Sequence, residues 1–314
     1  MNLARWSPAL AALLIAATFA EPRVPLARPR FEHVVVLDIT QSMNVTDVEL
    51  DGRPASRLAY ARRTLHEVLD TLPCGSRLGW GIFTEYRSFL LMAPVEVCAN
   101  RAELRSALAG IDGRMAWSGN SEVAKGGHAG IAIAKELPGK PALVFVTDGH
   151  EAPPLNPRHR PRFDDKPGEV PGVLVGVGAL KPAPIPKVDP RGRPLGTWGA
   201  DEVLQVDPRS QGRGASVGGE TMADDTPGGL GAAALGATPG GEHLSSLREA
   251  YLKLLAGENG LAYARLSSPQ ALRAAMTAPA FERPVTVAFD LRLVLSGLAF
   301  VLLLWPHAAA WRRR

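Results

Sequence analysis

The stretch that decides the fold is His33-Val-Val-Val-Leu-Asp38-Ile-Thr40-Gln-Ser42-Met43, an apolar, β-branched run that ends in one carboxylate and two hydroxyls at alternating positions. A parallel strand covered on both faces of its sheet is continuously apolar, and ligands of open α/β sheets bind at the carboxyl ends of such strands. The stretch therefore predicts a buried strand that carries Asp38, Thr40 and Ser42 to a binding site. A turn that caps the next helix is the plain alternative.

A second apolar run, PALVFVTDG (141–149), also ends in a carboxylate and predicts another strand. The carboxyl ends of neighbouring parallel strands meet at one edge of a sheet, so Asp148 can lie beside Asp38. Between the two runs, WSGNSEV (117–123) is a small polar loop that opens a helical pattern, and its Ser121 offers a third hydroxyl. We expect these three segments to converge.

The three segments resemble those of the von Willebrand factor A family, which combines a D-x-S-x-S strand end, a Thr or Ser from a later loop, and the Asp of a T-D-G strand end. The resemblance covers residues 31–280, in the family's order. It implies an α/β, Rossmann-like fold of three layers, with a mostly parallel central sheet and one antiparallel edge strand. Thr40 stands where the family more often has Ser, and Ser121 where it more often has Thr. Both departures keep the hydroxyl.

The resemblance also implies a metal-ion-dependent adhesion site. Hydroxyl and carboxylate oxygens suit hard divalent cations, so Mg, Ca or Mn is expected. Few of these oxygens are anionic, and the family completes the coordination with an acidic residue of a protein partner. Ser118 is an alternative to Ser121 as the loop ligand. The expected ligands are Asp38, Thr40, Ser42, Ser121 and Asp148.

An enzymatic function is the less favoured reading of the same site. Metal-assisted hydrolysis needs a general base near the ion, and His150 and Glu151, next to Asp148, are the candidates. A lone His in a loop is more often a surface residue. We therefore expect a docking site and no catalytic residues.

Both ends of the chain carry apolar segments that predict a membrane location. Residues 1–20 have the pattern of a secretory signal peptide, and an uncleaved anchor is the alternative. Residues 293–311 are almost free of charge, long enough to cross a bilayer of about 30 Å, and followed by three arginines. This predicts a single transmembrane helix in the inner membrane, with the main domain in the periplasm. A buried or membrane-associated helix is the alternative at this end.

The two cysteines, Cys74 and Cys98, flank two predicted strands, 77–83 and 88–95. They lie about equally far from the turn between these strands, which places them nearly opposite each other at the open end of a hairpin. An oxidising compartment favours a disulfide between them, and two buried thiols are the alternative.

Composition and periodicity describe the rest of the chain. The 314 residues are 46% hydrophobic, enough for one large core, and the net charge of +4 comes with no basic stripe that would indicate nucleic acid.

Two insertions rich in Pro, Gly or charge, 152–170 and 181–241, are expected to lack a core of their own. The first begins beside Asp148, where recognition residues are expected. Helical spacing of apolar residues predicts helices over 56–72, 101–109, 123–137, 244–255 and 269–277.

Four further stretches, DITQSMN (38–44), LPCGSR (72–77), GNSEVAKG (119–126) and TDGHEAPP (147–154), resemble MxaL-type accessory proteins of methanol-oxidation clusters. That resemblance implies a module that binds a periplasmic dehydrogenase or sister accessory proteins and helps a quinoprotein dehydrogenase to mature, for example by metal insertion. Surface adhesion or a role in envelope stress is the alternative binding function.

Overall fold

The computed structural model describes residues 3–155, 159–164, 166–189, 191–206, 221–224 and 240–311. Its contacts divide the chain into two units. Met1–Pro29 and Pro284–Arg314 form the smaller unit, and Arg30–Arg283 form the larger one.

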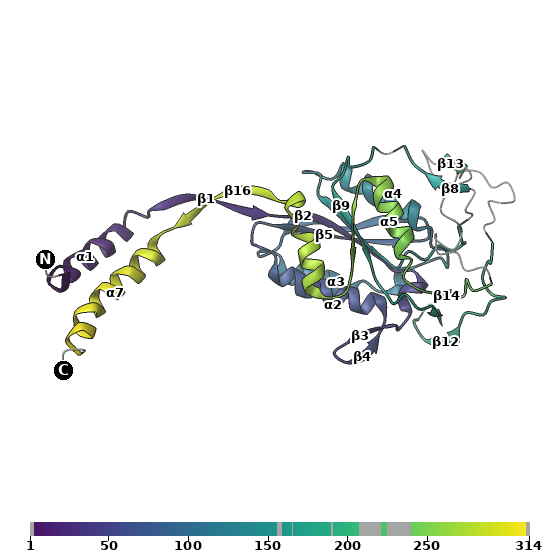
Figure 1. The fold of residues 1–314 in the computed structure, drawn as a ribbon, viewed down its shortest axis with the longest axis horizontal. Coiled ribbons are helices and arrows are strands. Elements are labelled where there is room, and N and C mark those ends of the chain that lie inside the picture. Colours follow the sequence, from purple (N-terminus) through teal and green to yellow (C-terminus); the bar gives the residue numbers. More distant parts are fainter. Residues whose placement is uncertain are drawn as a thin grey trace. The chain divides into compact units, whose positions relative to one another are not determined.

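A sheet lies at the centre of the larger unit (Figure 1). It has six strands in the order β15-β9-β7-β2-β5-β6. The first five strands run parallel to one another, and β6 pairs antiparallel with β5. In chain order, the strands are β2 (Glu32–Asp38), β5 (Arg77–Thr84), β6 (Arg87–Glu96), β7 (Ala142–Thr147), β9 (Gly172–Gly176) and β15 (Ala262–Arg265).

Helices cover both faces of this sheet, which is why β2 is buried along its whole length and apolar from Val34 to Leu37. Val35 and Leu37 of β2 belong to the core cluster with α2, α3 and α6, whereas Val34 and Val36 belong to the cluster with α4 and α5. The helices are α2 (Arg57–Thr71), α3 (Arg101–Gly110), α4 (Val123–Glu136), α5 (Glu249–Asn259) and α6 (Pro269–Met276).

Polar residues mark where several of these helices begin and end. The Ser56 hydroxyl accepts a hydrogen bond from the amide of Ala59 at the start of α2, and Ser268 does the same at the start of α6. Helix α5 ends at Gly260, whose φ of 66° is the left-handed conformation that glycine adopts most easily. Three short 3-10 helices complete the described helices: η1 (Gln41–Asn44), η2 (Gly113–Met115) and η4 (Pro279–Phe281).

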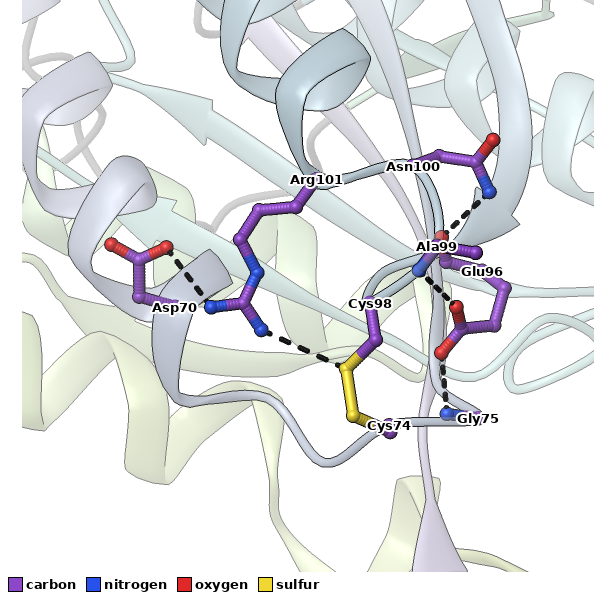
Figure 2. The surroundings of a disulfide bond; sticks show 8 residues. All are labelled: Asp70, Cys74, Gly75, Glu96, Cys98, Ala99, Asn100 and Arg101. Carbon is purple, nitrogen blue, oxygen red and sulfur yellow. Dashed lines mark hydrogen bonds and ion pairs between the residues drawn. A yellow bond between two sulfur atoms is a disulfide. The ribbon is translucent and has the colours of Figure 1, made fainter.

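Cys74 and Cys98 are joined by a disulfide, with their Cα atoms 5.3 Å apart. Figure 2 shows how the neighbouring backbone is held: the Glu96 carboxylate accepts hydrogen bonds of 2.6 Å from the amides of Gly75 and Ala99. These backbone bonds outweigh desolvation and lower the pKa of Glu96. The disulfide and the carboxylate together fasten the loop before β5 to the end of β6.

The smaller unit contains α1 (Leu3–Thr18), β1 (Arg23–Arg30), β16 (Arg283–Asp290) and α7 (Arg292–Trp311). Strands β1 and β16 form a two-stranded sheet, and α1 packs against α7. The start of α7 is tied to the start of β1 by a 3.0 Å hydrogen bond from the Leu291 amide to the Pro22 carbonyl.

The predicted fold class was wrong. The structure has a mixed set of sheets: besides the central sheet, the described residues form five two-stranded sheets, four of which are made by loops and insertions that carry no strand periodicity. Across the described residues, no helix has the length and apolar character needed to span a bilayer, so the transmembrane helix predicted for 293–311 is not supported.

Four of the small sheets lie in the larger unit: β3 (Val48–Leu50) with β4 (Arg53–Ala55), β8 (His159–Arg162) with β13 (Thr221–Asp224), β10 (Ala183–Pro184) with β14 (Leu244–Ser245), and β11 (Pro186–Val188) with β12 (Pro194–Thr197).

The helix predicted over 244–255 was also placed too early. Residues 244–245 form β14, and α5 starts only at Glu249. The apolar residues Leu244 and Leu247 fit a helical spacing, but pairing of β14 with β10 takes the first of them out of the helix. Tertiary pairing therefore overrides the local pattern.

Candidate functional site

The end of β2 and the end of β7 lie next to each other because these strands are parallel and in register, with Leu37 opposite Val146. Asp38 comes directly after Leu37 and Asp148 comes two residues after Val146, so both lie at the same edge of the sheet. Both carboxylates are completely buried.

Asp38 accepts hydrogen bonds on both carboxylate oxygens. Its Oδ1 accepts from the amide of Thr40 at 2.9 Å and from the Thr40 hydroxyl at 2.7 Å, and its Oδ2 accepts from the Thr147 hydroxyl at 2.6 Å. The Thr40 and Ser42 hydroxyl oxygens are 3.3 Å apart. The D-x-T-x-S stretch thus folds into a compact loop with its three polar side chains together.

Asp148 is held by a different set of partners. Its Oδ2 accepts from the Arg57 guanidinium and from the Ser245 hydroxyl at 2.9 Å, and its Oδ1 accepts from the amide of His150 at 3.0 Å. Arg57 is completely buried and also pairs with Asp47, with 2.5 Å between Nη2 and Oδ2. One guanidinium therefore links the start of α2 to the loops after β2 and β7.

The two carboxylates differ in their electrostatic balance. Burial and the neighbouring Asp148 raise the pKa of Asp38 to about 7, although its hydrogen bonds from Thr147 and Thr40 oppose the shift. For Asp148 burial acts in the same sense, but the Arg57 cation, His150 and the hydrogen bond from Ser245 together outweigh it, and the pKa is lowered. Asp148 has a counter-ion, whereas Asp38 forms no ion pair within the described part of the chain.

Ser121 approaches the same edge from the loop before α4. Its backbone exchanges two hydrogen bonds with Ala152, of 2.6 and 2.7 Å, which fastens the loop to the segment after β7. Its hydroxyl is buried and has no hydrogen-bond partner among the described residues. The alternative residue, Ser118, has its hydroxyl engaged by the amide of Asn120 at 3.1 Å.

A cavity of about 190 Å³ opens over these residues. The hydroxyl residues Thr40, Ser42 and Ser121 line it, together with residues 150–154 after β7. Residues 198 and 202–204 of the second insertion form a further part of its wall. The indole of Trp198 donates a hydrogen bond to the side chain of Gln41, so this insertion is attached directly to the site loop.

His150 and Glu151 also line the cavity, but both make contacts within the protein. Burial, assisted by the nearby Arg248 cation, lowers the pKa of His150 to about 4. The Glu151 carboxylate accepts a hydrogen bond from the Tyr251 hydroxyl at 2.6 Å and another from the Ala124 amide at 3.1 Å, near the start of α4. His150 Nδ1 lies 3.3 Å from Nη2 of Arg248, the residue before α5, and Glu151 links the start of α4 to α5.

Sequence patterns did not indicate four residues of this edge: Arg57, Thr147, Trp198 and Ser245. Thr147 could have been predicted from the sequence, because it directly precedes Asp148 at the end of the second apolar run. The other three had no signal: Arg57 is one polar residue at the start of an amphipathic helix, and Trp198 and Ser245 are far from the motif along the chain.

The residues present fit a divalent cation. Arg57 pairs with two largely buried carboxylates, those of Asp47 and Asp148, and the third buried carboxylate, that of Asp38, has no ion pair among the described residues. The unpartnered hydroxyl of Ser121 and the adjacent hydroxyls of Thr40 and Ser42 supply the neutral oxygens that Mg, Ca and Mn accept. A cation bound beside Asp38 would therefore be stabilised by this carboxylate and by the neighbouring hydroxyl oxygens.

Comparison with known proteins finds likenesses of structure only. No family model matches the chain, and no curated protein matches it. An aerotolerance-related membrane protein from Bacteroides fragilis is similar at 17% identity and a TM-score of 0.48, over 80% of this chain and 98% of that one. A membrane-spanning protein of unknown function from Vibrio fischeri is similar at 14% identity and a TM-score of 0.29, over 76% and 94%. The PilB minor pilin of Streptococcus sanguinis is similar at 13% identity and a TM-score of 0.38, over 88% and 64%. Likenesses at this level assign no function.

Proposed function

We propose that the larger unit is a von Willebrand A-type binding module whose metal-ion-dependent adhesion site recruits an acidic residue of a protein partner. One observation carries the proposal: the hydroxyls of Thr40, Ser42 and Ser121 line a cavity beside a buried carboxylate, Asp38, that has no counter-cation among the described residues. The sequence resemblance to that family supports it.

Asp38, Thr40, Ser42, Ser121 and Asp148 are the residues that would hold the ion. The Arg57 guanidinium donates a hydrogen bond to one carboxylate oxygen of Asp148. Part of the negative charge of Asp148 is thereby neutralised, which leaves less of it to balance the charge of the ion. The bound cation would supply an electrophilic position that a partner's carboxylate completes. This is binding chemistry, and the proposed module is not an enzyme.

The proposed partner is a protein of the cell envelope. The N-terminal sequence pattern and the disulfide favour an oxidising compartment, which in a bacterial envelope is the periplasm. The sequence resemblance to accessory proteins of methanol oxidation adds a specific client to this proposal, a quinoprotein dehydrogenase whose maturation the module aids. The comparisons do not point to that client.

Metal binding is the first test. Mn²⁺, Mg²⁺ and Ca²⁺ are titrated calorimetrically into the full-length protein and into Asp38→Asn, Ser121→Ala and Ser118→Ala. We expect the parent to bind at least one ion, Asp38→Asn to lose binding, and Ser121→Ala to weaken it about tenfold, the usual order for a lost contact around a metal.

Ser118→Ala is the matched control, because it removes a hydroxyl from the same loop without touching the cavity. It should bind the ion like the parent. A parent that binds none of the three ions, or an Asp38→Asn variant that binds as tightly as the parent, would refute the metal site.

Partner capture is the second test. Envelope extract is passed over immobilised parent or Asp38→Asn, each with Mg²⁺ or with chelator. Proteins held only by the parent with metal support the docking role. If Asp38→Asn in chelator retains the same proteins as the parent with Mg²⁺, the docking role is refuted. The surface of the second insertion around Trp198 would then be the next candidate for partner binding.

A further inference from the structure

Helices α1 and α7 of the smaller unit bury only a narrow stripe against each other. Among the side chains of α7 whose burial is described, residues 292–305, the covered ones are Leu295, Ala299 and Leu302, which recur at helical spacing and form one face. In α1, Ala11 is completely buried, and Leu14, one turn further on, is partly covered. Alanines at the closest approach allow two helix backbones to pack tightly.

The rest of both helices is apolar and exposed. A helix that covers a protein core has one apolar face and one polar face, whereas α7 carries large apolar side chains around most of its circumference. The exposed fractions of Phe300 and Leu304 are 62% and 49%. The exposed large apolar residues of the two helices are Trp6, Leu10, Leu13 and Ile15 in α1, and Leu293, Val294, Leu298, Phe300, Val301, Leu303, Leu304 and Trp305 in α7.

These exposed apolar side chains form one continuous surface and are not isolated residues among polar ones. In the larger unit, exposed large apolar side chains are fewer and are spread over several loops and strands, for example Leu180 and Leu195. Contiguous apolar surface of this kind marks a contact with a protein or a membrane.

Charge separates the two units as well. The segments of the smaller unit, 1–29 and 284–314, hold seven of the 35 basic residues and two of the 31 acidic ones, so they carry a net charge of +5. The larger unit is left with −1, and the whole positive balance of +4 belongs to the smaller unit. The basic residues are Arg5 near the start of α1, Arg23 and Arg28 in β1, Arg292 at the start of α7, and the three arginines after residue 311.

We propose that paired α1 and α7 insert their outward apolar side chains into the apolar layer of an anionic lipid bilayer. A partner's groove covers one face of a helix, whereas lipid can cover side chains that point in many directions from two helices. The flanking arginines complement anionic headgroups. Binding requires neither helix to cross the bilayer, but it requires residues 3–18 to remain on the mature chain.

Vesicle flotation with the full-length protein tests this proposal. Vesicles of phosphatidylethanolamine with phosphatidylglycerol are compared with vesicles of phosphatidylcholine alone. The double variant Phe300→Glu, Leu304→Glu places charge on the outward face and leaves the stripe between the helices intact. The matched control, Leu180→Glu with Leu195→Glu, makes the same change at exposed apolar residues of the larger unit, whose exposed fractions are 56% and 59%.

We expect the parent and the control to float with anionic vesicles, more weakly with neutral ones, and the helix variant to lose at least about tenfold in vesicle affinity. Intact mass of the membrane-bound protein should include residues 3–18. Equal flotation of parent and helix variant would overturn the proposal.

Two other outcomes would also overturn it. A parent that binds neither vesicle but sediments as a multimer, which the helix variant dissociates, identifies the surface as a contact between copies of this chain. A bound protein whose mass lacks residues 3–18 shows that α1 takes no part. The test uses no metal, so its outcome is independent of the adhesion site.

Discussion

Arg57 shows how one side chain can organise a site that no local pattern describes. Its guanidinium contacts Asp148, Asp47 and Ser245, and these residues come from three segments that are far apart in the sequence. A charge removed from water is stabilised only when its partners are in place, so these contacts depend on each other.

Replacing Arg57 by Leu should leave Asp47 and Asp148 without their cation in a buried environment. We expect a loss of about 3–5 kcal/mol in the free energy of unfolding, the usual result when one partner of a buried ion pair is removed. Urea unfolding measures it. The control is Arg63→Leu in the same helix, whose exposed pair with Glu67 should contribute less than about 1 kcal/mol. Equal effects of the two variants would contradict the assignment of Arg57 as the central cation.

His33 gives the larger unit a dependence on pH that is separate from the site. It lies in the core at the start of β2, where burial lowers its pKa to about 4 despite a 2.8 Å hydrogen bond to the Met276 carbonyl, and the Arg283 cation acts in the same direction as burial. The unfolded chain binds a proton at His33 below its ordinary pKa of about 6.5, and the folded chain does so only near pH 4. The contribution of neutral His33 to the free energy of unfolding is therefore complete above pH 6.5 and is lost as the pH is lowered from 6.5 to 4.

His33→Gln keeps a hydrogen-bond donor for Met276 and does not titrate. Between pH 7 and pH 4.5 the parent should lose on the order of 2 kcal/mol more stability than His33→Gln, apart from any offset that the substitution causes at both pH values. Unfolding curves at the two pH values measure this difference. Parallel pH profiles would show that His33 is not the responsible group.

At the scale of elements, contacts between segments that are far apart in the sequence decide how closely helices and strands can pack. Helix α4 carries two adjacent glycines, Gly126 and Gly127. A Cβ atom at Gly126 would lie 2.2 Å from the Phe83 ring of β5, whereas one at Gly127 would meet nothing within 4 Å. The first glycine is thus needed for packing of α4 on the sheet, and the second is not.

Gly126→Ala should destabilise the protein by about 2 kcal/mol, because the ring of Phe83 must move in a well-packed core. Gly127→Ala is its matched control and should be neutral or stabilising by up to about 1 kcal/mol, since alanine favours the helix. Thermal unfolding compares the two. A stabilising effect of Gly126→Ala would show that α4 lies further from β5 than in the structure.

At the scale of the molecule, the chain has two units of different character. The larger unit has two apolar cores on either side of one sheet, a nearly balanced charge, and a cavity at the sheet edge. The smaller unit exposes its apolar residues and holds the positive charge. This division is consistent with separate tasks, partner binding by one unit and attachment by the other.

If the larger unit binds a divalent cation, the ion should stabilise the unit as a whole. At an ion concentration of about 100 times Kd, linkage predicts a gain of about 2.7 kcal/mol, or roughly 5–10 °C in Tm for a domain of this size. Near-ultraviolet circular dichroism during heating, with ion or with chelator, measures the shift. Asp38→Asn should melt at the same temperature in both, and a shift retained by this variant would place the ion elsewhere.

The sequence determined by itself those features that depend on neighbours along the chain. The apolar run before Asp38 forms a buried strand, because four consecutive apolar side chains favour a strand that is covered on both faces. The D-x-T-x-S spacing brings Asp38, Thr40 and Ser42 together, since a tight loop places alternate side chains on one side. The contrast between the apolar ends and the rest of the chain was likewise visible in composition.

Only the tertiary structure decided which distant residues complete the site. Arg57 and Ser245 lie 91 and 97 residues from Asp148 along the chain, and no periodicity links a buried cation to the carboxylates that it will meet. The same holds for the small sheets and for β14, which pairs with β10 across the second insertion instead of extending α5. Local pattern reports which face of an element is buried, whereas the partners of a buried polar group are set by contacts that form only when the chain has folded.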